Sequence, residues 1–229
     1  MKDQAPLGDT LYIGTRRYSS WSMRGWLAVH LAGLDVAEVV LPLAGGITPA
    51  VRAVSPGGTV PYLEHQGAKL WESLAICEYC AEFMPALWPA NRAARAHARA
   101  IASEMHAGFR ELRMAMPMSL YRAGAAGTCV TDGAAADIAR IDAVWTDTRA
   151  RFGAGGAFLF GAAFGNADVM YAPVVARLLT YRPRLSPAAQ AYCDAVRAHP
   201  LVDAWYAAAA REPTEWHLEK YEAAPAAAP

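Results

Sequence analysis

The sequence predicts a small four-stranded α/β domain followed by an all-helical domain. Up to about residue 85, short strand-like runs alternate with amphipathic helices. From about residue 92 onward, the periodicity is almost entirely helical. Between these two parts, Pro85 and Pro89 would break a continuous helix. We therefore expect domains at residues 1–86 and 92–222, followed at 223–229 by a disordered tail of alanine and proline.

The amino-terminal half begins with the pattern of a β-α-β unit. Thr10–Gly14 is typical of a short buried strand, and Val36–Leu41 is a β-branched run that indicates a second strand. Gly33 stands between them where a helix would end. The helix is indicated by residues at helical spacing: Met23, Trp26, Leu27, His30 and Leu31. This order predicts a parallel pair of strands joined by a helix.

A β-hairpin and a further helix complete the predicted sheet domain. Val60–Glu64 and Lys69–Glu72 flank the turn-like stretch His65–Ala68, which indicates a hairpin. Ser73 then begins a helix. Its apolar face consists of Ile76, Tyr79, Cys80 and Phe83.

The carboxyl-terminal half is predicted to consist of helices. The first is expected to run without interruption from Ala93 to Met116, where Pro117 ends it. The others are expected at Ala134–Phe152, Asp168–Tyr181, Pro187–Ala198 and Pro200–Ala210. Asp168–Tyr181 is so apolar that we expect it to be buried.

Charge, hydropathy and cysteine content exclude several classes of protein. The chain has 21 Lys and Arg against 21 Asp and Glu, and this zero net charge argues against a nucleic-acid partner. No stretch of about 18 residues is apolar and uncharged, so we expect no membrane-spanning helix. No apolar leader precedes Leu11, so we expect no secretory signal. Four cysteines are too few for a disulfide scaffold, which favours a cytoplasmic protein with reduced thiols.

Two patterns that resemble redox or metal sites are better explained by packing. Cys77 and Cys80 have C-x-x-C spacing, but they lie inside a later helix rather than at the helix start that lowers the pKa of a redox thiol. We therefore interpret both as packing residues. The six histidines have no metal-ligand spacing, so no metal is predicted.

Two local signals point to ligand binding, and each has a purely structural alternative. Ser19 and Ser20 lie between the first strand and the first helix, where a hydroxyl and the helix dipole could stabilise an anion such as a thiolate. Serine is also an ordinary N-cap. The bond before Pro61 could be cis, which would turn the Val60 backbone toward an extended ligand, or it could be a trans bond at a strand start.

A third signal lies between the hairpin and the next helix. Glu72 could hold the ammonium group of a ligand beside Ser73. The alternative is that Ser73 only caps the helix. Local sequence does not decide between these interpretations.

Taken in order, these segments resemble a cytosolic glutathione S-transferase over nearly the whole chain. The resemblance rests on Ser19–Ser22, Ser55–Leu63 and Leu70–Ile76 in the α/β half. It continues with Leu87–Pro89 at the linker and with Phe158–Asp168 in the helical half. Each segment is modest alone, but their joint order and spacing are specific. The serine loop is most similar to that of zeta-like and related bacterial members.

The resemblance implies a thioredoxin-like amino-terminal domain, an all-helical carboxyl-terminal domain, glutathione as cosubstrate and a homodimer. Ser19 would hydrogen-bond the glutathione sulfur, with Ser20 as its fallback. Val60 would pair with the cysteinyl backbone of glutathione across a cis Pro61, and Glu72 and Ser73 would hold the γ-glutamyl end. The implied glutathione-binding residues are Thr59, Val60, Pro61, Glu72 and Ser73.

The sequence departs from the family pattern at two places. Trp21 stands where zeta members have the cysteine of Ser-Ser-Cys, which counts against isomerisation of maleylacetoacetate and adds bulk to the site. Gly165 stands three residues before Asp168, where Ser or Thr is usual, so we expect Asp168 to lack its normal N-cap partner. Because Gly is a tolerable N-cap, folding should survive.

We therefore expect a glutathione S-transferase that activates the glutathione thiolate for attack on small hydrophobic electrophiles. Since a free thiol has a pKa of about 8.5, a hydroxyl donor and a helix N-terminus would be needed to favour the anion at neutral pH. The alternatives are a glutathione-dependent isomerase or reductive dehalogenase on the same scaffold, or a non-catalytic interaction protein. The expected second-substrate pocket comprises Trp21, Met105, His106, Phe109, Arg110, Arg113 and Trp216. The electrophile, the dimer interface and a role such as detoxification are not given by the sequence.

Overall fold

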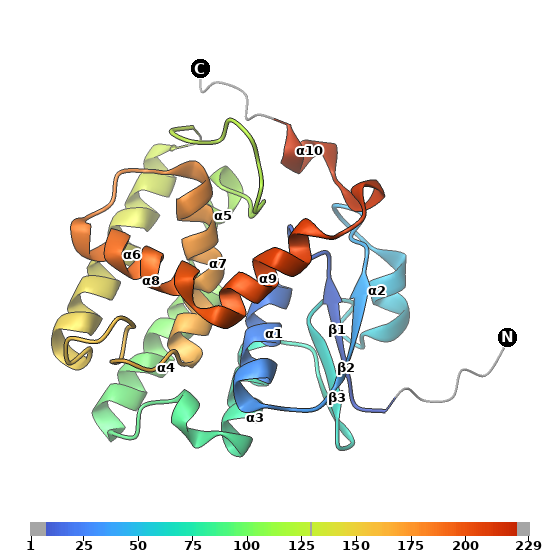
Figure 1. Cartoon of the computed structure of the whole chain (residues 1–229), viewed down its shortest axis with the longest axis horizontal. Helices are drawn as coiled ribbons and strands as arrows, with labels where there is room; N and C mark the ends of the chain where they lie inside the picture. The colour runs from blue at the N-terminus through green and yellow to red at the C-terminus, as the bar shows by residue number, and fades with distance from the viewer. Residues whose placement is uncertain (1–7, 129, 224–229) are drawn as a thin grey trace, which may run out of the picture.

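A four-stranded sheet with its helices packs against a larger helical domain (Figure 1). The structure is a computed structural model, and it describes residues 8–128 and 130–223. Cys129 and all but the first residue of the tail predicted at 223–229 lie outside the described residues. The predicted fold class, an α/β thioredoxin-like domain followed by an all-helical domain, is confirmed.

The sheet has the strand order β2-β1-β3-β4. Its strands are β1 (Thr10–Gly14), β2 (Ala37–Leu41), β3 (Tyr62–His65) and β4 (Ala68–Leu70). As predicted, β1 and β2 are parallel, whereas β3 pairs antiparallel with both β1 and β4. The hairpin turn is Gln66-Gly67, and both residues have positive φ, 49° and 81°. A two-residue turn of this hand fits the twist of the strands it joins.

Three helices belong to the sheet domain, and one of them was not expected. They are α1 (Ser20–Ala32), α2 (Pro49–Val54) and α3 (Ser73–Phe83). Gly33 ends α1 in the left-handed conformation, as its position predicts. The short helix α2 escaped prediction because six residues carry little periodicity. Its signal is Thr48 at the N-cap position followed by Pro49 in the first helical turn.

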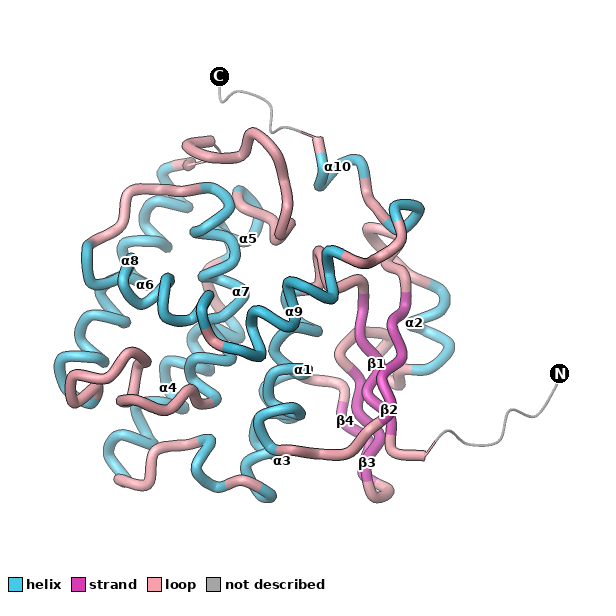
Figure 2. The backbone as a smooth tube through the Cα atoms, viewed as in Figure 1, coloured by secondary structure: helices cyan, strands magenta, loops and turns pink. Residues whose placement is uncertain are grey.

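The remaining secondary-structure elements of the described chain are helices joined by loops (Figure 2). They are η1 (Pro85–Leu87), α4 (Arg92–Ala107), α5 (Arg110–Ala115), α6 (Asp132–Phe152), α7 (Asn166–Tyr181), α8 (Pro187–Ala198), α9 (Pro200–Ala210), η2 (Thr214–Trp216) and α10 (Glu219–Glu222). The bounds of α8 and α9 are those predicted. Among the described residues, no helix combines the length and apolar character needed to cross a bilayer. The domain limits at residues 86 and 92 stay a prediction.

The prediction of one helix from Ala93 to Met116 is wrong. The chain breaks at Gly108, which ends α4, and Phe109 has a φ of 59°, which lies in the left-handed region. At Gly108, a Cβ would lie 2.8 Å from the carbonyl oxygen of Glu104, so a larger residue would not fit this bend. Phe109 is buried, with 7% of its surface exposed. Its packing therefore accompanies a backbone conformation that a non-glycine residue rarely adopts.

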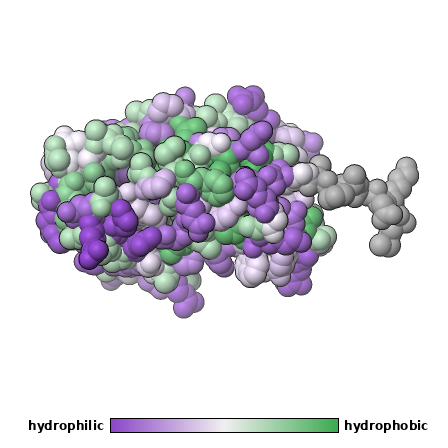
Figure 3. Space-filling view, turned by 90° about the horizontal axis from the view of Figure 1, so that it is seen from below, coloured by the Kyte–Doolittle hydropathy of each residue, from purple (hydrophilic) through white to green (hydrophobic). Residues whose placement is uncertain are grey.

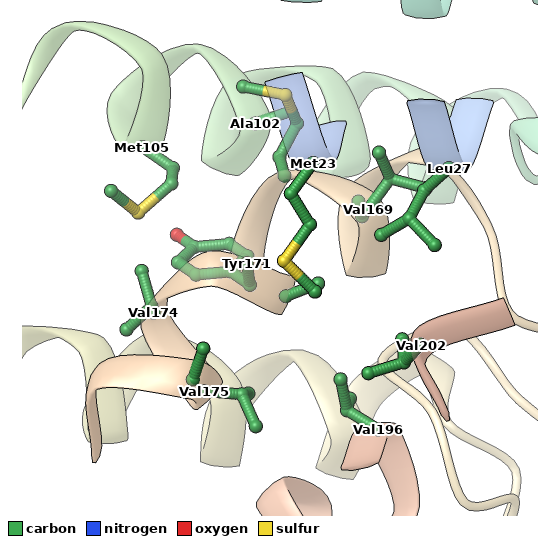
Figure 4. Packing of buried hydrophobic residues seen from close by; sticks show 14 of the residues in the cluster. Met23, Leu27, Ala102, Met105, Val169, Tyr171, Val174, Val175, Val196 and Val202 are labelled. Carbon is green, nitrogen blue, oxygen red and sulfur yellow. The ribbon is translucent and has the colours of Figure 1, made fainter. Parts of the chain in front are cut away.

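Helix α7 is the centre of the molecule, as its apolar sequence predicts. Fourteen of its 16 residues are buried. It contacts α1 of the sheet domain as well as α4 and α8. Figure 4 shows side chains from these elements converging: Met23 and Leu27 from α1, Ala102 and Met105 from α4, Val169 and Tyr171 from α7, and Val196 from α8.

At the amino-terminal end of α7, the N-cap has no side chain, as the sequence predicts, and Asp168 forms its hydrogen bonds with other groups. The helix begins at Asn166, two residues earlier than predicted, with Gly165 as N-cap. One carboxylate oxygen of Asp168 accepts the Gly165 N–H at 3.0 Å. The other accepts the Leu159 N–H at 3.1 Å and the Tyr192 hydroxyl at 2.9 Å. The cap works without a side chain at Gly165 because it uses the backbone N–H of that residue.

We predict that Asp168→Asn destabilises the fold by roughly 2–4 kcal/mol, because the amide cannot accept all three hydrogen bonds at a buried site. Asp194→Asn, an exposed carboxylate on α8 that accepts a hydrogen bond from Gln190, is the matched control and should change stability little. Urea unfolding of the three proteins measures the difference.

The difference in unfolding free energy between wild type and Asp168→Asn should depend on pH. Burial raises the pKa of Asp168 above its usual range, to about 6. The folded state therefore binds the proton more tightly than the unfolded state. Wild-type stability relative to Asp168→Asn should fall as the pH rises from about 4 to about 6, and should stay level above that range. A difference that does not change with pH would show that this carboxyl does not titrate in the window.

Candidate functional site

A cleft opens where the carboxyl end of β1 meets the amino-terminal end of α1. It consists of two adjoining hollows of about 400 Å³ and 360 Å³. Trp21, Thr59 and Val60 line both hollows. The first extends toward α2 and the loop before it, and the second extends toward the β4–α3 junction and α4. Ligands of α/β sheets commonly bind at this kind of position, at strand carboxyl ends and helix amino-terminal ends.

Ser19 is the N-cap of α1 and lines the first hollow. Its Oγ accepts the backbone N–H of Ser22 at 3.2 Å. Ser20, the first residue of the helix, lines the same hollow. Both serines are more than nine-tenths buried. Both hydroxyls are thus held where free N–H groups and the helix dipole favour negative charge.

A second buried hydroxyl supports Ser19. The Oγ atoms of Ser19 and Ser22 lie 2.7 Å apart and share a hydrogen bond. Ser22 Oγ also accepts the N–H of Gly14, the last residue of β1, at 2.9 Å. This contact ties the amino-terminal end of α1 to the end of the strand.

The segment between α2 and β3 forms the floor that the two hollows share. The peptide bond between Val60 and Pro61 is cis, one of the two possibilities that the sequence left open. Thr59 Oγ1 donates a hydrogen bond to the Trp71 carbonyl at 3.4 Å. Helix α1 packs directly on this segment at Gly25, where an added Cβ would lie 2.7 Å from Cγ and 2.8 Å from Cβ of Pro61.

Gly25→Ala should therefore weaken ligand binding in the cleft. Alanine improves intrinsic helix propensity by about 1 kcal/mol, but the clash with Pro61 displaces the floor and costs about 1–3 kcal/mol. We predict a several-fold higher dissociation constant for glutathione in calorimetry. Gly8→Ala is the control, because nothing lies within 4 Å of its Cβ position. Equal affinity of Gly25→Ala and wild type would contradict the prediction.

The junction of β4 and α3 places two polar side chains in the second hollow. Glu72 is the N-cap residue and Ser73 is the first helical residue, which corrects the expectation that Ser73 is the cap. The Glu72 carboxylate lies 3.6 Å from Nε2 of His106 on α4. Burial lowers the pKa of His106, against the raising effect of Glu72. Ser73 Oγ is buried and has no hydrogen-bond partner among the described residues, so it is available to a ligand.

Three arginines gather behind the cleft, and none of them forms an ion pair with a carboxylate in the described residues. Each donates to backbone carbonyls instead: Arg24 to Met170, Arg113 to Gly108 and Arg177 to Met116. Burial lowers the pKa of Arg24 well below its usual value, and it lowers that of Arg177 to about 9 with help from the nearby Arg113 charge. This concentration of positive charge favours an anion.

Trp21 lies between this charge and the cleft. The centroid of its ring lies 4.7 Å from Arg24 Cζ and 4.9 Å from Arg113 Cζ. The His106 ring meets it edge-on, with centroids 5.3 Å apart. Both cation–π contacts hold the indole in place.

The other residues predicted for a second-substrate pocket are scattered. Met105 is fully buried in the core, and Phe109 packs there as well, because both lie on the inner face of the bent α4–α5 segment. Arg110 is exposed at the start of α5. Trp216 lies in η2 and lines neither hollow. Of the predicted pocket set, the structure brings Trp21, His106 and Arg113 together.

Sequence reasoning missed Ser22, Arg24 and Arg177. A charged residue inside an otherwise apolar helix was the available signal for Arg177, because a buried charge needs a reason. Its guanidinium reaches Ser20 Oγ at 3.3 Å. Ser22 lies in the Ser19–Ser22 motif but was not given a role of its own.

The segment after α9 ties down the loop that leads to Ser19. Arg17 donates two hydrogen bonds to the Glu222 carboxylate, at 2.5 Å and 2.8 Å. The Tyr18 hydroxyl donates to the same carboxylate and accepts the Leu218 N–H. Burial and the bond to Glu222 raise the pKa of Tyr18 to about 12, so its hydroxyl stays protonated. The loop before Ser19 and Ser20 is thus fixed by contacts with Leu218 and Glu222.

Comparisons with known proteins agree with this architecture. Residues 18–82 match the family model of the glutathione S-transferase amino-terminal domain. A probable maleylacetoacetate isomerase of Caenorhabditis elegans is 32% identical over 129 residues, which span 56% of this chain and 58% of that relative. The matched segment therefore covers little more than half of the relative's length.

Solved structures share the whole architecture. A theta class glutathione S-transferase from Xanthomonas axonopodis pv. citri, with glutathione bound, is 26% identical and has a TM-score of 0.62, covering 86% of this chain and 96% of that one. Maleyl pyruvate isomerase, a bacterial zeta class member, is 23% identical with a TM-score of 0.68, covering 90% and 99%. Residues 18–82 are thus similar to the glutathione S-transferase amino-terminal domain, and the described chain as a whole shares the fold of these solved structures.

Proposed function

We propose that the protein is a glutathione-dependent transferase in which Ser19 stabilises the glutathione thiolate. The observation that carries the proposal is the position of the Ser19 hydroxyl, at the amino-terminal end of α1 and on the wall of the cleft. A hydroxyl there can donate to a sulfur anion, and the helix dipole adds to the effect. Ser20, the next residue on the same wall, is the alternative donor.

The second hollow suits the γ-glutamyl end of glutathione. Ser73 has a buried hydroxyl without a partner in the described part of the chain, and Glu72 supplies a carboxylate for the ammonium group. Val60 lines both hollows and offers its backbone to the cysteinyl unit between them. We assign Thr59 and Pro61 to the same binding floor.

The glutathione thiolate would form a C–S bond at the electrophilic carbon of the second substrate, and the leaving group on that carbon would depart with its bonding electrons, as chloride does from chlorodinitrobenzene. Ser19 holds the sulfur as its anion, and the floor around Val60 orients it. Trp21 closes the site on the side of the arginines and keeps water from that face. The protein thus acts by stabilising the anion and by proximity, without a covalent bond to itself.

We predict that Ser19→Ala binds glutathione with nearly unchanged affinity but raises the pKa of the bound thiol by roughly 1–2 units. At neutral pH the thiolate fraction, and the rate with chlorodinitrobenzene, should then fall about tenfold or more. Calorimetry measures binding, and ultraviolet absorbance of the thiolate across a pH series measures the pKa. If both proteins bind and lower the thiol pKa equally, the donor is Ser20 or the helix dipole. If the wild type does not bind glutathione, the proposal fails.

A second candidate is glutathione-dependent isomerisation of an unsaturated carboxylate. It is supported by the match to the probable maleylacetoacetate isomerase and by the three arginines without carboxylate partners. A substrate carboxylate would supply the missing anion beside Arg113, the least buried of the three. Trp21 counts against it, because the indole fills space where the zeta pattern has a small cysteine.

For this candidate we predict that Arg113→Gln raises KM for a cis dicarboxylic enone about tenfold, since a charge-assisted contact of roughly 1–2 kcal/mol is lost. KM for neutral chlorodinitrobenzene should stay within about twofold, because that substrate has no carboxylate. Arg92→Gln, at the exposed start of α4, is the control. An equal change in KM for both substrates would point to a structural effect and contradict the candidate.

We also propose that the protein forms a homodimer and that its domains span residues 1–86 and 92–222. Three large apolar side chains near α3 support the first point: Trp71, Phe83 and Met84 are 44%, 41% and 41% exposed. Figure 3 views the molecule from the side of α3 and the hairpin, and hydrophobic residues are interspersed there with hydrophilic ones.

A further inference from the structure

We propose that Ser22 is a positioning residue that directs the hydroxyl proton of Ser19 into the cleft. The proposal rests on the proposed function of Ser19. It assigns to a second, fully buried serine the task of setting the direction in which the first one donates.

The burial and contacts of Ser22 carry this inference. Ser22 has no exposed surface. Its Oγ lies 2.7 Å from Ser19 Oγ and accepts the Gly14 N–H at 2.9 Å. Ser19 Oγ in turn accepts the Ser22 N–H at 3.2 Å. The Ser19 oxygen is therefore held by both the backbone and the side chain of one residue.

The number of hydroxyl protons determines which serine donates in the hydrogen bond between Ser19 and Ser22. The two hydroxyls have two protons between them, and only one proton can lie in their shared hydrogen bond. If Ser19 donates to Ser22, the buried Ser22 proton has no other acceptor among the described residues. If Ser22 donates to Ser19, the Ser22 proton has its acceptor, and the Ser19 proton points into the cleft, where a bound anion can accept it. A buried donor without a partner is costly, so a bound thiolate selects the second arrangement.

The chain of donors then runs from Gly14 N–H to Ser22, from Ser22 to Ser19, and from Ser19 to the sulfur. Successive hydrogen bonds of this kind polarise one another in the same direction. Ser20 stands outside the chain, because its hydroxyl contacts Arg177 instead. A helix cap alone does not require the Ser22 hydroxyl, since the cap uses the Ser22 N–H.

The test compares Ser22→Ala and Ser22→Thr with Ser19→Ala and wild type. We expect Ser22→Ala to bind glutathione within about threefold of wild type and to raise the pKa of the bound thiol by roughly one unit, a tenfold change in the ionisation constant. With chlorodinitrobenzene, kcat should fall about tenfold while KM stays nearly constant. Ser22→Thr keeps the hydroxyl and should restore the thiol pKa. Ser119→Ala, a buried serine elsewhere whose Oγ has no partner among the described residues, controls for loss of a buried hydroxyl.

Each outcome separates the two proposals. If Ser19→Ala raises the thiol pKa and Ser22→Ala does not, the role of Ser22 is overturned and that of Ser19 stands. If neither variant raises it although both bind glutathione, the assignment of Ser19 fails as well. A wild type that does not bind glutathione overturns the proposed function itself.

A second variant covers the case in which Ser22→Ala does not fold, since it leaves the Gly14 N–H without an acceptor. Ser22→Cys nearly preserves the side-chain volume but is a weak donor and acceptor. It should raise the thiol pKa above that of Ser22→Thr. Equal thiol pKa values in the Cys and Thr variants would overturn the proposal.

Discussion

The burial of α7 between the sheet domain and the other helices is the constraint on which the rest of the structure depends. A helix with 14 of 16 residues buried cannot leave its terminal backbone groups unpaired. At the amino-terminal end, the Asp168 carboxylate accepts the N–H of the N-cap residue Gly165, and it also accepts the Leu159 N–H and the Tyr192 hydroxyl. The neighbouring Asn166 donates to the Cys77 carbonyl of α3 at 2.8 Å, so the same helix end joins the two domains. The helix cap, the core packing and the contact between the two domains therefore meet at the amino-terminal end of α7.

The position of α1, which begins next to Ser19, depends on this arrangement. Helix α1 lies between the sheet and α7, and Arg24 of α1 donates to the Met170 carbonyl of α7 at 2.9 Å. At the other end of α1, Ser22 joins the helix to the last residue of β1. Ser19 is thus fixed from two sides before any ligand binds. Such preorganisation lets a hydroxyl stabilise a developing or bound anion without first reorganising the site.

The sequence predicts those parts whose chemistry is local. Gly33 ends α1, Gln66-Gly67 forms the hairpin turn, and Pro187 and Pro200 begin α8 and α9, because each depends on a backbone preference that one or two residues set. The break at Phe109 could not be predicted, since its left-handed conformation accompanies burial against residues distant in sequence. The cluster of Arg24, Arg113 and Arg177 could not be predicted either, because it too depends on contacts between residues distant in sequence. Its members come from α1, α5 and α7, and no local pattern relates them.

Trp21 is distinctive both in the sequence and in the structure. In sequence it is a bulky residue that departs from the zeta pattern, and that departure alone favours a neutral, hydrophobic second substrate. In the structure its ring contacts two guanidinium groups, so the bulk is part of an electrostatic arrangement. An indole held in this way screens Arg24 from the cleft, while Arg113 keeps part of its surface exposed. Under the two proposed functions, Arg113 would select the charge of the substrate and Trp21 its size. Because separate residues set these two properties, the transferase and isomerase proposals can be distinguished on the same scaffold.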